Sequence, residues 1–102
     1  KSAQFRRIPF SVTKQEAWDL FEAQDGICAL SGTPLSMYAL RQDYTASLDR
    51  ISSTKGYETG NLQWVHKNVN LMKNVTENDN FIDWCNRITD HNRKRDTNEP
   101  VL

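Results

Sequence analysis

Two stretches of the chain carry apolar side chains at helical spacing. Thr13 followed by Glu16 is a capping-box pattern, and the apolar face behind it runs until Gly26, which predicts a helix over about 14–25. A second cap pattern precedes an apolar stripe that predicts another helix over about 77–90. The stripe consists of Phe81, Trp84, Cys85 and Ile88.

The middle of the chain alternates with the period of a β-strand. Residues 45–51 place one set of side chains on each face, Ala46, Leu48 and Arg50 on one and Ser47, Asp49 and Ile51 on the other. A glycine-containing loop over 52–60 and a short strand over 61–65 would complete a hairpin with a long connection. Beyond it, His66, Asn70 and Asn74 recur at intervals of four, which indicates one face of a helix. The predicted order of helix, strand, strand, helix, helix is that of an α+β fold.

Length and composition fit one soluble domain. A chain of 102 residues supports a single modest core, which we expect over about 10–90, with flexible ends over 1–9 and 91–102. No apolar run approaches the roughly 20 residues that span a bilayer, and no leader sequence is visible, so a cytoplasmic location is the simplest expectation.

Charge and cysteine content narrow the function little. Thirteen basic and thirteen acidic side chains cancel, so overall charge does not indicate a polyanionic partner. Arg6 and Arg7 near the start and a basic run over 93–95 are compatible with solvated ends or with nucleic-acid contacts. Cys28 and Cys85 form no metal-knuckle spacing, and we expect both to be small core residues.

Candidate chemistry gathers around the hairpin. Asp49 near the end of one strand and His66 and Asn70 after the next would be brought together by strand pairing. Carboxylate and amide oxygens are hard ligands that suit Mg²⁺ or Mn²⁺, and an imidazole can join them or act as a base. The same three residue types also occur together for structural reasons, so spacing alone leaves the role open.

Several ordered blocks carry a more specific signal. They are Cys28 to Gly32, Ser47-Leu48-Asp49-Arg50-Ile51, Lys55-Gly56-Tyr57, Gly60-Asn61-Leu62-Gln63-Trp64-Val65-His66-Lys67, and then Asn70 and Lys73. In this arrangement, from about Phe10 to Ile88, the chain resembles phage and bacterial HNH endonucleases. The resemblance implies a ββα-metal (His-Me finger) core of hairpin plus helix with flanking N- and C-terminal helices.

The resemblance also implies roles for individual residues. Asp49 and Asn70 match the metal-binding positions, and Asn61 matches the asparagine that braces the loop. One divalent ion is implied, Mg²⁺ or Mn²⁺ rather than Zn²⁺ or Ni²⁺, with double-stranded DNA as the partner in a bacterial or phage-infected cell. Lys67 and Lys73 are expected to neutralise phosphates at the cleft.

The chain departs from the family where the usual enzyme has a histidine that activates water. Arg50 occupies that position, and a guanidinium cannot act as a base, although it can bind the scissile phosphate or stabilise transition-state charge. His66 is then the candidate catalytic residue, either as general base or as a third metal ligand, while a role in capping the helix or packing on Trp64 stays open.

The leading hypothesis is therefore hydrolysis of DNA phosphodiester bonds at a one-metal HNH-type site. One alternative is a nucleic-acid-binding module that keeps the fold and has lost catalysis, for which Arg50 is the best support. A second is a metal-stabilised interaction domain of a larger protein. Double-strand cleavage would favour a homodimer, because its symmetry would match that of the duplex.

Overall fold

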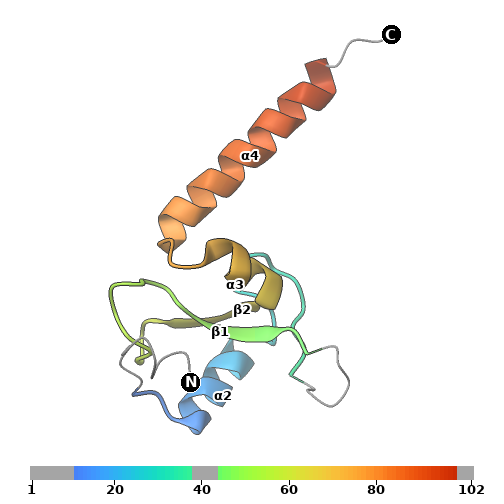
Figure 1. The fold of residues 1–102 in the computed structure, drawn as a ribbon. Coiled ribbons are helices and arrows are strands. Elements are labelled where there is room, and N and C mark those ends of the chain that lie inside the picture. The colour runs from blue at the N-terminus through green and yellow to red at the C-terminus, as the bar shows by residue number, and fades with distance from the viewer. Residues whose placement is uncertain (1–10, 38–43, 99–102) are drawn as a thin grey trace.

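A two-stranded antiparallel hairpin with helices on both faces forms the body of the protein. The computed structural model describes residues 11–37 and 44–98. Within them the order is α2 (Lys14–Ala23), β1 (Ala46–Arg50), β2 (Leu62–His66), α3 (Lys67–Lys73) and α4 (Asn78–Asn98). Helix α2 lies against one face of the hairpin and α3 against the other, and α4 projects away from both (Figure 1). The predicted α+β class and element order are confirmed.

Helix α2 begins where the sequence predicts. The Thr13 Oγ1 atom accepts a hydrogen bond from the Glu16 backbone N–H (3.1 Å), and the Glu16 carboxylate accepts one from the Thr13 backbone N–H (2.8 Å). These bonds satisfy amides that have no partner within the helix. The chain reverses after the helix through Asp25 and Gly26, both with positive φ (56° and 65°). The positive φ at Gly26 favours glycine there.

The strand register fixes which side chains share a face. Asp49 pairs with Gln63, and Ser47 pairs with Val65. Because alternate side chains point to opposite faces, these four residues face α3, as the α3 contacts of Ser47 and Asp49 show. The partition of β1 into two faces agrees with the sequence pattern.

The core lies mainly on the α2 side of the hairpin. Trp64 is buried, its ring meets Phe21 edge to face at a centroid distance of 5.8 Å, and its indole N–H donates to the Ala17 carbonyl (2.8 Å). Gln24 extends this contact, because its side-chain amide binds both the N–H (2.9 Å) and the C=O (3.0 Å) of Trp64. Cys28 is buried as expected, whereas Cys85 is exposed and the prediction of a core role for it is wrong.

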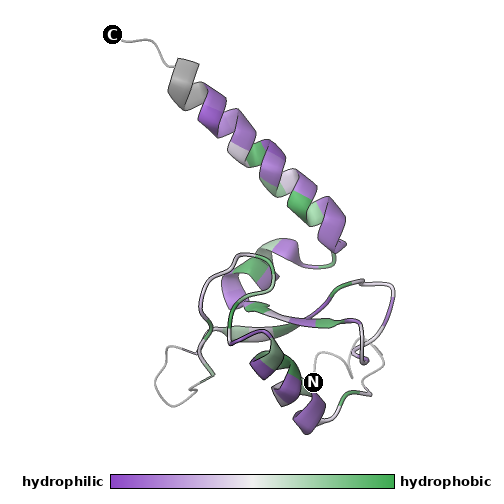
Figure 2. Ribbon diagram, turned by 180° about the vertical axis from the view of Figure 1, so that it is seen from behind, coloured by the Kyte–Doolittle hydropathy of each residue, from purple (hydrophilic) through white to green (hydrophobic). Residues whose placement is uncertain are grey.

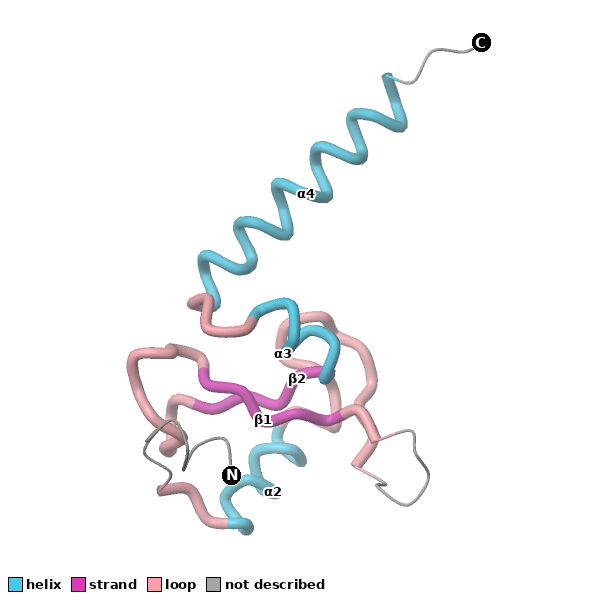
Figure 3. The backbone as a smooth tube through the Cα atoms, viewed as in Figure 1, coloured by secondary structure: helices cyan, strands magenta, loops and turns pink. Residues whose placement is uncertain are grey.

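Helix α4 is longer than the sequence pattern predicts. It continues to Asn98, beyond the predicted end at about 90, while residues 1–10 and 99–102 lie outside the described part. The expectation of flexible ends over 1–9 and 91–102 stays a prediction. Every side chain from Ile82 to Lys94 is exposed. Figures 2 and 3 show a long, mostly hydrophilic helix reaching away from the body, within a molecule that measures 57 × 32 × 24 Å. Across the described residues, no helix has the length and apolarity of a membrane span.

Candidate functional site

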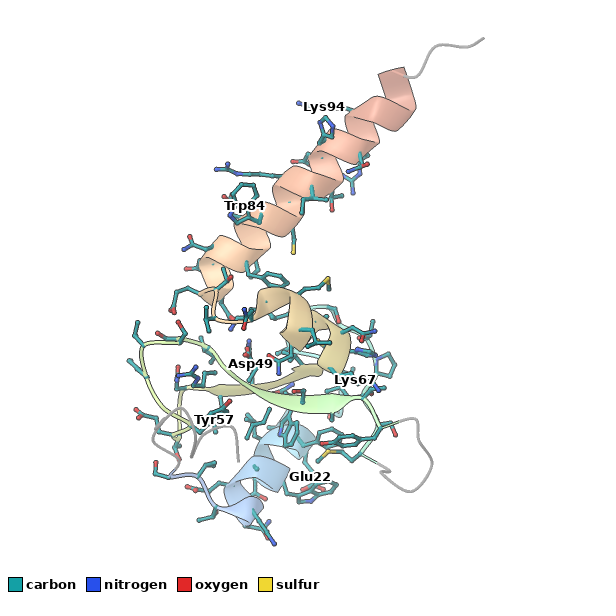
Figure 4. The ribbon with its side chains drawn as sticks, in the orientation of Figure 1. Glu22, Asp49, Tyr57, Lys67, Trp84 and Lys94 are labelled. Carbon is teal, nitrogen blue, oxygen red and sulfur yellow. The ribbon has the colours of Figure 1, made fainter. Side chains whose placement is uncertain are left out.

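A polar pocket of about 310 Å³ opens where the end of β1, the following loop and α3 meet. Asp49 and Arg50 of β1 form part of its wall. Asn70 of α3 and Asn74, the C-cap residue of that helix, also line it. In Figure 4, Asp49 lies between the hairpin and α3, and Tyr57 belongs to the loop beside them. The remaining lining residues are Ser53, Tyr57, Leu71 and Val75.

The Asp49 carboxylate is held by two donors on one oxygen. Its Oδ2 atom accepts a hydrogen bond from Gln63 Nε2 (2.9 Å) and forms a salt bridge with Lys73 Nζ (2.9 Å). Gln63 is itself fixed by paired amide hydrogen bonds with Asn78 at the start of α4. No described residue binds Asp49 Oδ1, so one carboxylate oxygen is available at the pocket.

Asn70 is oriented in the same way from the other wall. Its Nδ2 atom donates to the Ser47 hydroxyl (2.6 Å), and Ser47 shares the α3-facing side of β1 with Asp49. This bond assigns the amide nitrogen to the strand and leaves the carbonyl oxygen without a partner among the described residues. The structure therefore brings Asn70 and Asp49 together at one pocket, as the sequence predicted.

Arg50 lies on the pocket wall but is held by the loop. Its Nη1 atom donates to the carbonyl oxygens of Ser53 (3.0 Å) and Lys55 (2.9 Å), and the guanidinium lies 5.5 Å from the centre of the Tyr57 ring. These contacts use one nitrogen of a group with five N–H donors. The other N–H donors of the Arg50 guanidinium have no hydrogen-bond partner within the described part of the chain.

Asn61 braces the loop between the strands. This buried side chain accepts from the Ser52 N–H (2.9 Å) and donates to the carbonyls of Ser52 (3.1 Å) and Gly56 (2.9 Å). The amide thereby satisfies three backbone groups of the loop that carries Ser53 and Tyr57 to the pocket. This placement agrees with the bracing role expected for Asn61.

His66 does not lie where the interval of four places it. It is the last residue of β2 and the N-cap of α3, its Nδ1 accepts from the Asn68 N–H (3.1 Å), and it pairs with Ala46 rather than Asp49. Three strand positions, about 10 Å, separate the two pairs. His66 does not line the pocket, so the expectation that it shares a helical face with Asn70 is wrong. The interval applies only inside a helix, and α3 begins one residue later.

The two lysines of α3 differ from expectation and from each other. Lys67 is exposed at the start of the helix, outside the pocket lining. Lys73 is 1% exposed, and its ammonium donates to the Arg50 carbonyl (2.7 Å) in addition to its salt bridge with Asp49. The expectation that Lys73 faces phosphate in the cleft is therefore wrong. Its spacing of three from Asn70 was the available signal, because both must then face β1.

A carboxylate that the sequence pattern did not indicate lies beside the pocket. Glu77 accepts hydrogen bonds from the hydroxyl (2.6 Å) and the backbone N–H (2.8 Å) of Ser53. The Ser53 hydroxyl bond is the largest cause that holds the pKa of the Glu77 carboxyl below its usual value. Nothing in the local pattern indicated this contact, because 24 residues separate the partners.

The pocket offers oxygen ligands of the type that a hard cation prefers, although it has few charged ligands. The described residues contain no group of three or more His, Cys, Asp and Glu side chains that could hold a metal ion. One carboxylate and one amide oxygen are nevertheless ligands that Mg²⁺ accepts, since this ion keeps several waters and takes few protein ligands. Comparison of the chain with family models, curated proteins and solved structures gave no match.

Proposed function

We propose that this protein is a metal-dependent endonuclease that hydrolyses DNA phosphodiester bonds at this pocket. The observation that carries the proposal is the convergence of Asp49, Asn70 and Arg50 on one polar pocket. Two of these side chains offer oxygen ligands and the third offers a cationic donor for a phosphate. The ordered HNH-like blocks from which the same residues were selected support the proposal independently.

Asp49 and Asn70 would hold the ion through the two oxygens that have no described partner. A divalent ion bound there supplies Lewis acidity toward the phosphate and acidifies a water. Lys73 and Gln63 keep the Asp49 carboxylate in one orientation, so little reorganisation is needed on binding. The remaining N–H donors of Arg50 would bind a non-bridging phosphate oxygen and stabilise the charge that develops on it.

A nucleic-acid-binding module without catalysis is the second candidate. One observation favours it: among the described residues, no imidazole lines the pocket, and Arg50 cannot accept a proton. The described pocket residues therefore include no obvious general base for water. The two candidates share the fold and the phosphate contacts and differ only in whether bonds are cut.

Plasmid nicking in Mg²⁺ or Mn²⁺, compared with EDTA, separates the two candidates. We expect metal-dependent nicking by the parent protein and its loss in Asp49→Asn, which keeps the shape of the side chain. Removal of a hydrogen-bond partner of a metal ligand lowers metal affinity or activity by roughly 10–100-fold. Removal of a metal ligand itself should lower the nicking rate by more than that. Asn70→Ala should have a similar effect.

Asn68→Ala is the matched control, because Asn68 is exposed on the same helix and does not line the pocket. It should nick at the parent rate. A parent protein that binds duplex DNA but never nicks it in either metal would establish the binding module instead.

A further inference from the structure

The charges around the pocket lead to an inference about the order in which it is filled. We propose that the pocket takes up its divalent ion only together with a phosphodiester, and that Lys73 imposes this order. The inference rests on the proposed function, because it concerns the same ion and the same phosphate. It identifies Lys73 as the residue that makes metal uptake depend on nucleic acid.

The charged groups at the pocket wall balance one another. Among the described residues, Asp49 is the one acidic residue that lines the pocket, and the buried Lys73 ammonium lies 2.9 Å from its carboxylate. Arg50 lines the pocket as a second cation, and Glu77 binds the wall through Ser53 as a second anion. These two positive and two negative groups cancel, so the described part of the chain presents no surplus of negative charge at the pocket.

This balance of charge disfavours a cation bound alone. A divalent ion at Asp49 Oδ1 would lie close to the Lys73 ammonium. This ammonium is shielded from solvent, because Lys73 is 1% exposed. Repulsion in such a buried place is poorly screened. The attraction of Asp49 for the ion is then largely offset by Lys73, and the bare pocket binds the ion weakly.

A phosphodiester changes the charge balance of the pocket. It brings one negative charge into a pocket where Arg50 has donors left for it. With the phosphate present, the negative groups outnumber the positive ones, and a phosphate oxygen adds a hard ligand to those of Asp49 and Asn70. Binding of the ion and binding of nucleic acid are therefore mutually favourable, and each must strengthen the other by the same factor.

Mn²⁺ binding to the full chain without nucleic acid tests the role of Lys73 directly. Free Mn²⁺ is counted by its electron paramagnetic resonance signal at constant pH. The parent should bind Mn²⁺ weakly, and Lys73→Met should bind it at least about tenfold more tightly. Lys14→Met changes the net charge equally at the start of α2, across the hairpin from the pocket, and should bind like the parent.

A second variant covers the case in which Lys73→Met does not fold, as a thermal melt would show. Arg50→Gln removes the other cation of the wall and should also tighten Mn²⁺ binding without nucleic acid. Equal affinity of the parent, Lys73→Met and Arg50→Gln for Mn²⁺ would overturn the inference.

Binding of a fluorescent 20-base-pair duplex, measured by anisotropy, tests the coupling from the other side. The parent should bind the duplex more tightly in Mn²⁺ than in EDTA, and Asp49→Asn should lose this gain. Tight Mn²⁺ binding by the bare parent together with nicking would overturn the inference and leave the nuclease proposal standing. Absence of Mn²⁺ binding with and without the duplex would overturn both.

Discussion

At the residue scale, His66 is placed for a structural role rather than a catalytic one. Its side chain caps α3 by accepting the Asn68 N–H, and it lies outside the pocket. We expect His66→Ala to lower the free energy of unfolding by about 1 kcal/mol, the usual cost of losing an N-cap. Metal-dependent nicking at a temperature where the variant is folded should stay within about twofold of the parent. A tenfold loss in folded protein would return His66 to the chemistry.

Asn61 should contribute more to the free energy of unfolding than a single exposed polar residue does. Its amide binds three backbone groups of the loop, and the side chain is buried. Asn61→Ala should therefore reduce the free energy of unfolding by about 2–4 kcal/mol, because buried groups of the loop lose their partners. Urea denaturation measures the loss. Asn68→Ala, on the exposed surface of α3, should leave the urea midpoint unchanged.

Glu77 should make the free energy of unfolding depend on pH in the acid range. Hydrogen bonds from Ser53 lower the pKa of this carboxyl in the folded protein below 4.5, its ordinary value. A lowered pKa means that the contribution is complete above the unfolded value and is lost as the pH falls through the folded one. We expect the urea midpoint to fall between about pH 5 and about pH 3, and less steeply in Glu77→Gln. Glu16, whose pKa is lowered by its bond with the Thr13 backbone, will keep part of the slope.

At the scale of elements, the capping box of α2 is the most direct link from sequence to stability. Thr13→Ala removes the acceptor for the Glu16 N–H and should lower the free energy of unfolding by about 1 kcal/mol. Thr13→Ser keeps the hydroxyl oxygen and should restore most of the loss. If both variants denature at the parent midpoint, the cap contributes nothing to the folded protein.

How far the sequence predicted each element depends on how local its cause is. The cap of α2 and the alternation of β1 are set by neighbouring residues, so both were predictable. The end of α4 was not, because residues 91–98 lack the apolar stripe on which the prediction relied. Asp49 and Asn70 were predicted to lie close together, and both line the pocket, whereas the burial of Lys73 depends on how α3 lies across β1. The contact of Glu77 with Ser53 arises only from tertiary packing.

At the scale of the whole molecule, the body and α4 are joined at a narrow region. The side-chain hydrogen bonds that join them, among the described residues, are the amide pair of Gln63 with Asn78 and the bond of Glu77 to Ser53, and both occur at or before the first residue of α4. From Ile82 to Lys94 the helix offers only exposed side chains. Most of α4 therefore does not contribute to the core that holds the pocket.

Removal of residues 89–102 tests this division. The urea midpoint of the shortened chain should correspond to a change in unfolding free energy within about 0.5 kcal/mol, as for surface changes that touch no buried group. Removal of residues 78–102 should destabilise the protein clearly, because Gln63 loses both amide bonds with Asn78 and holds Asp49 less firmly. Equal stability of the two shortened chains would mean that Asn78 does not support the pocket. A large loss in the longer one would instead show that the distal half of α4 contacts the body in solution.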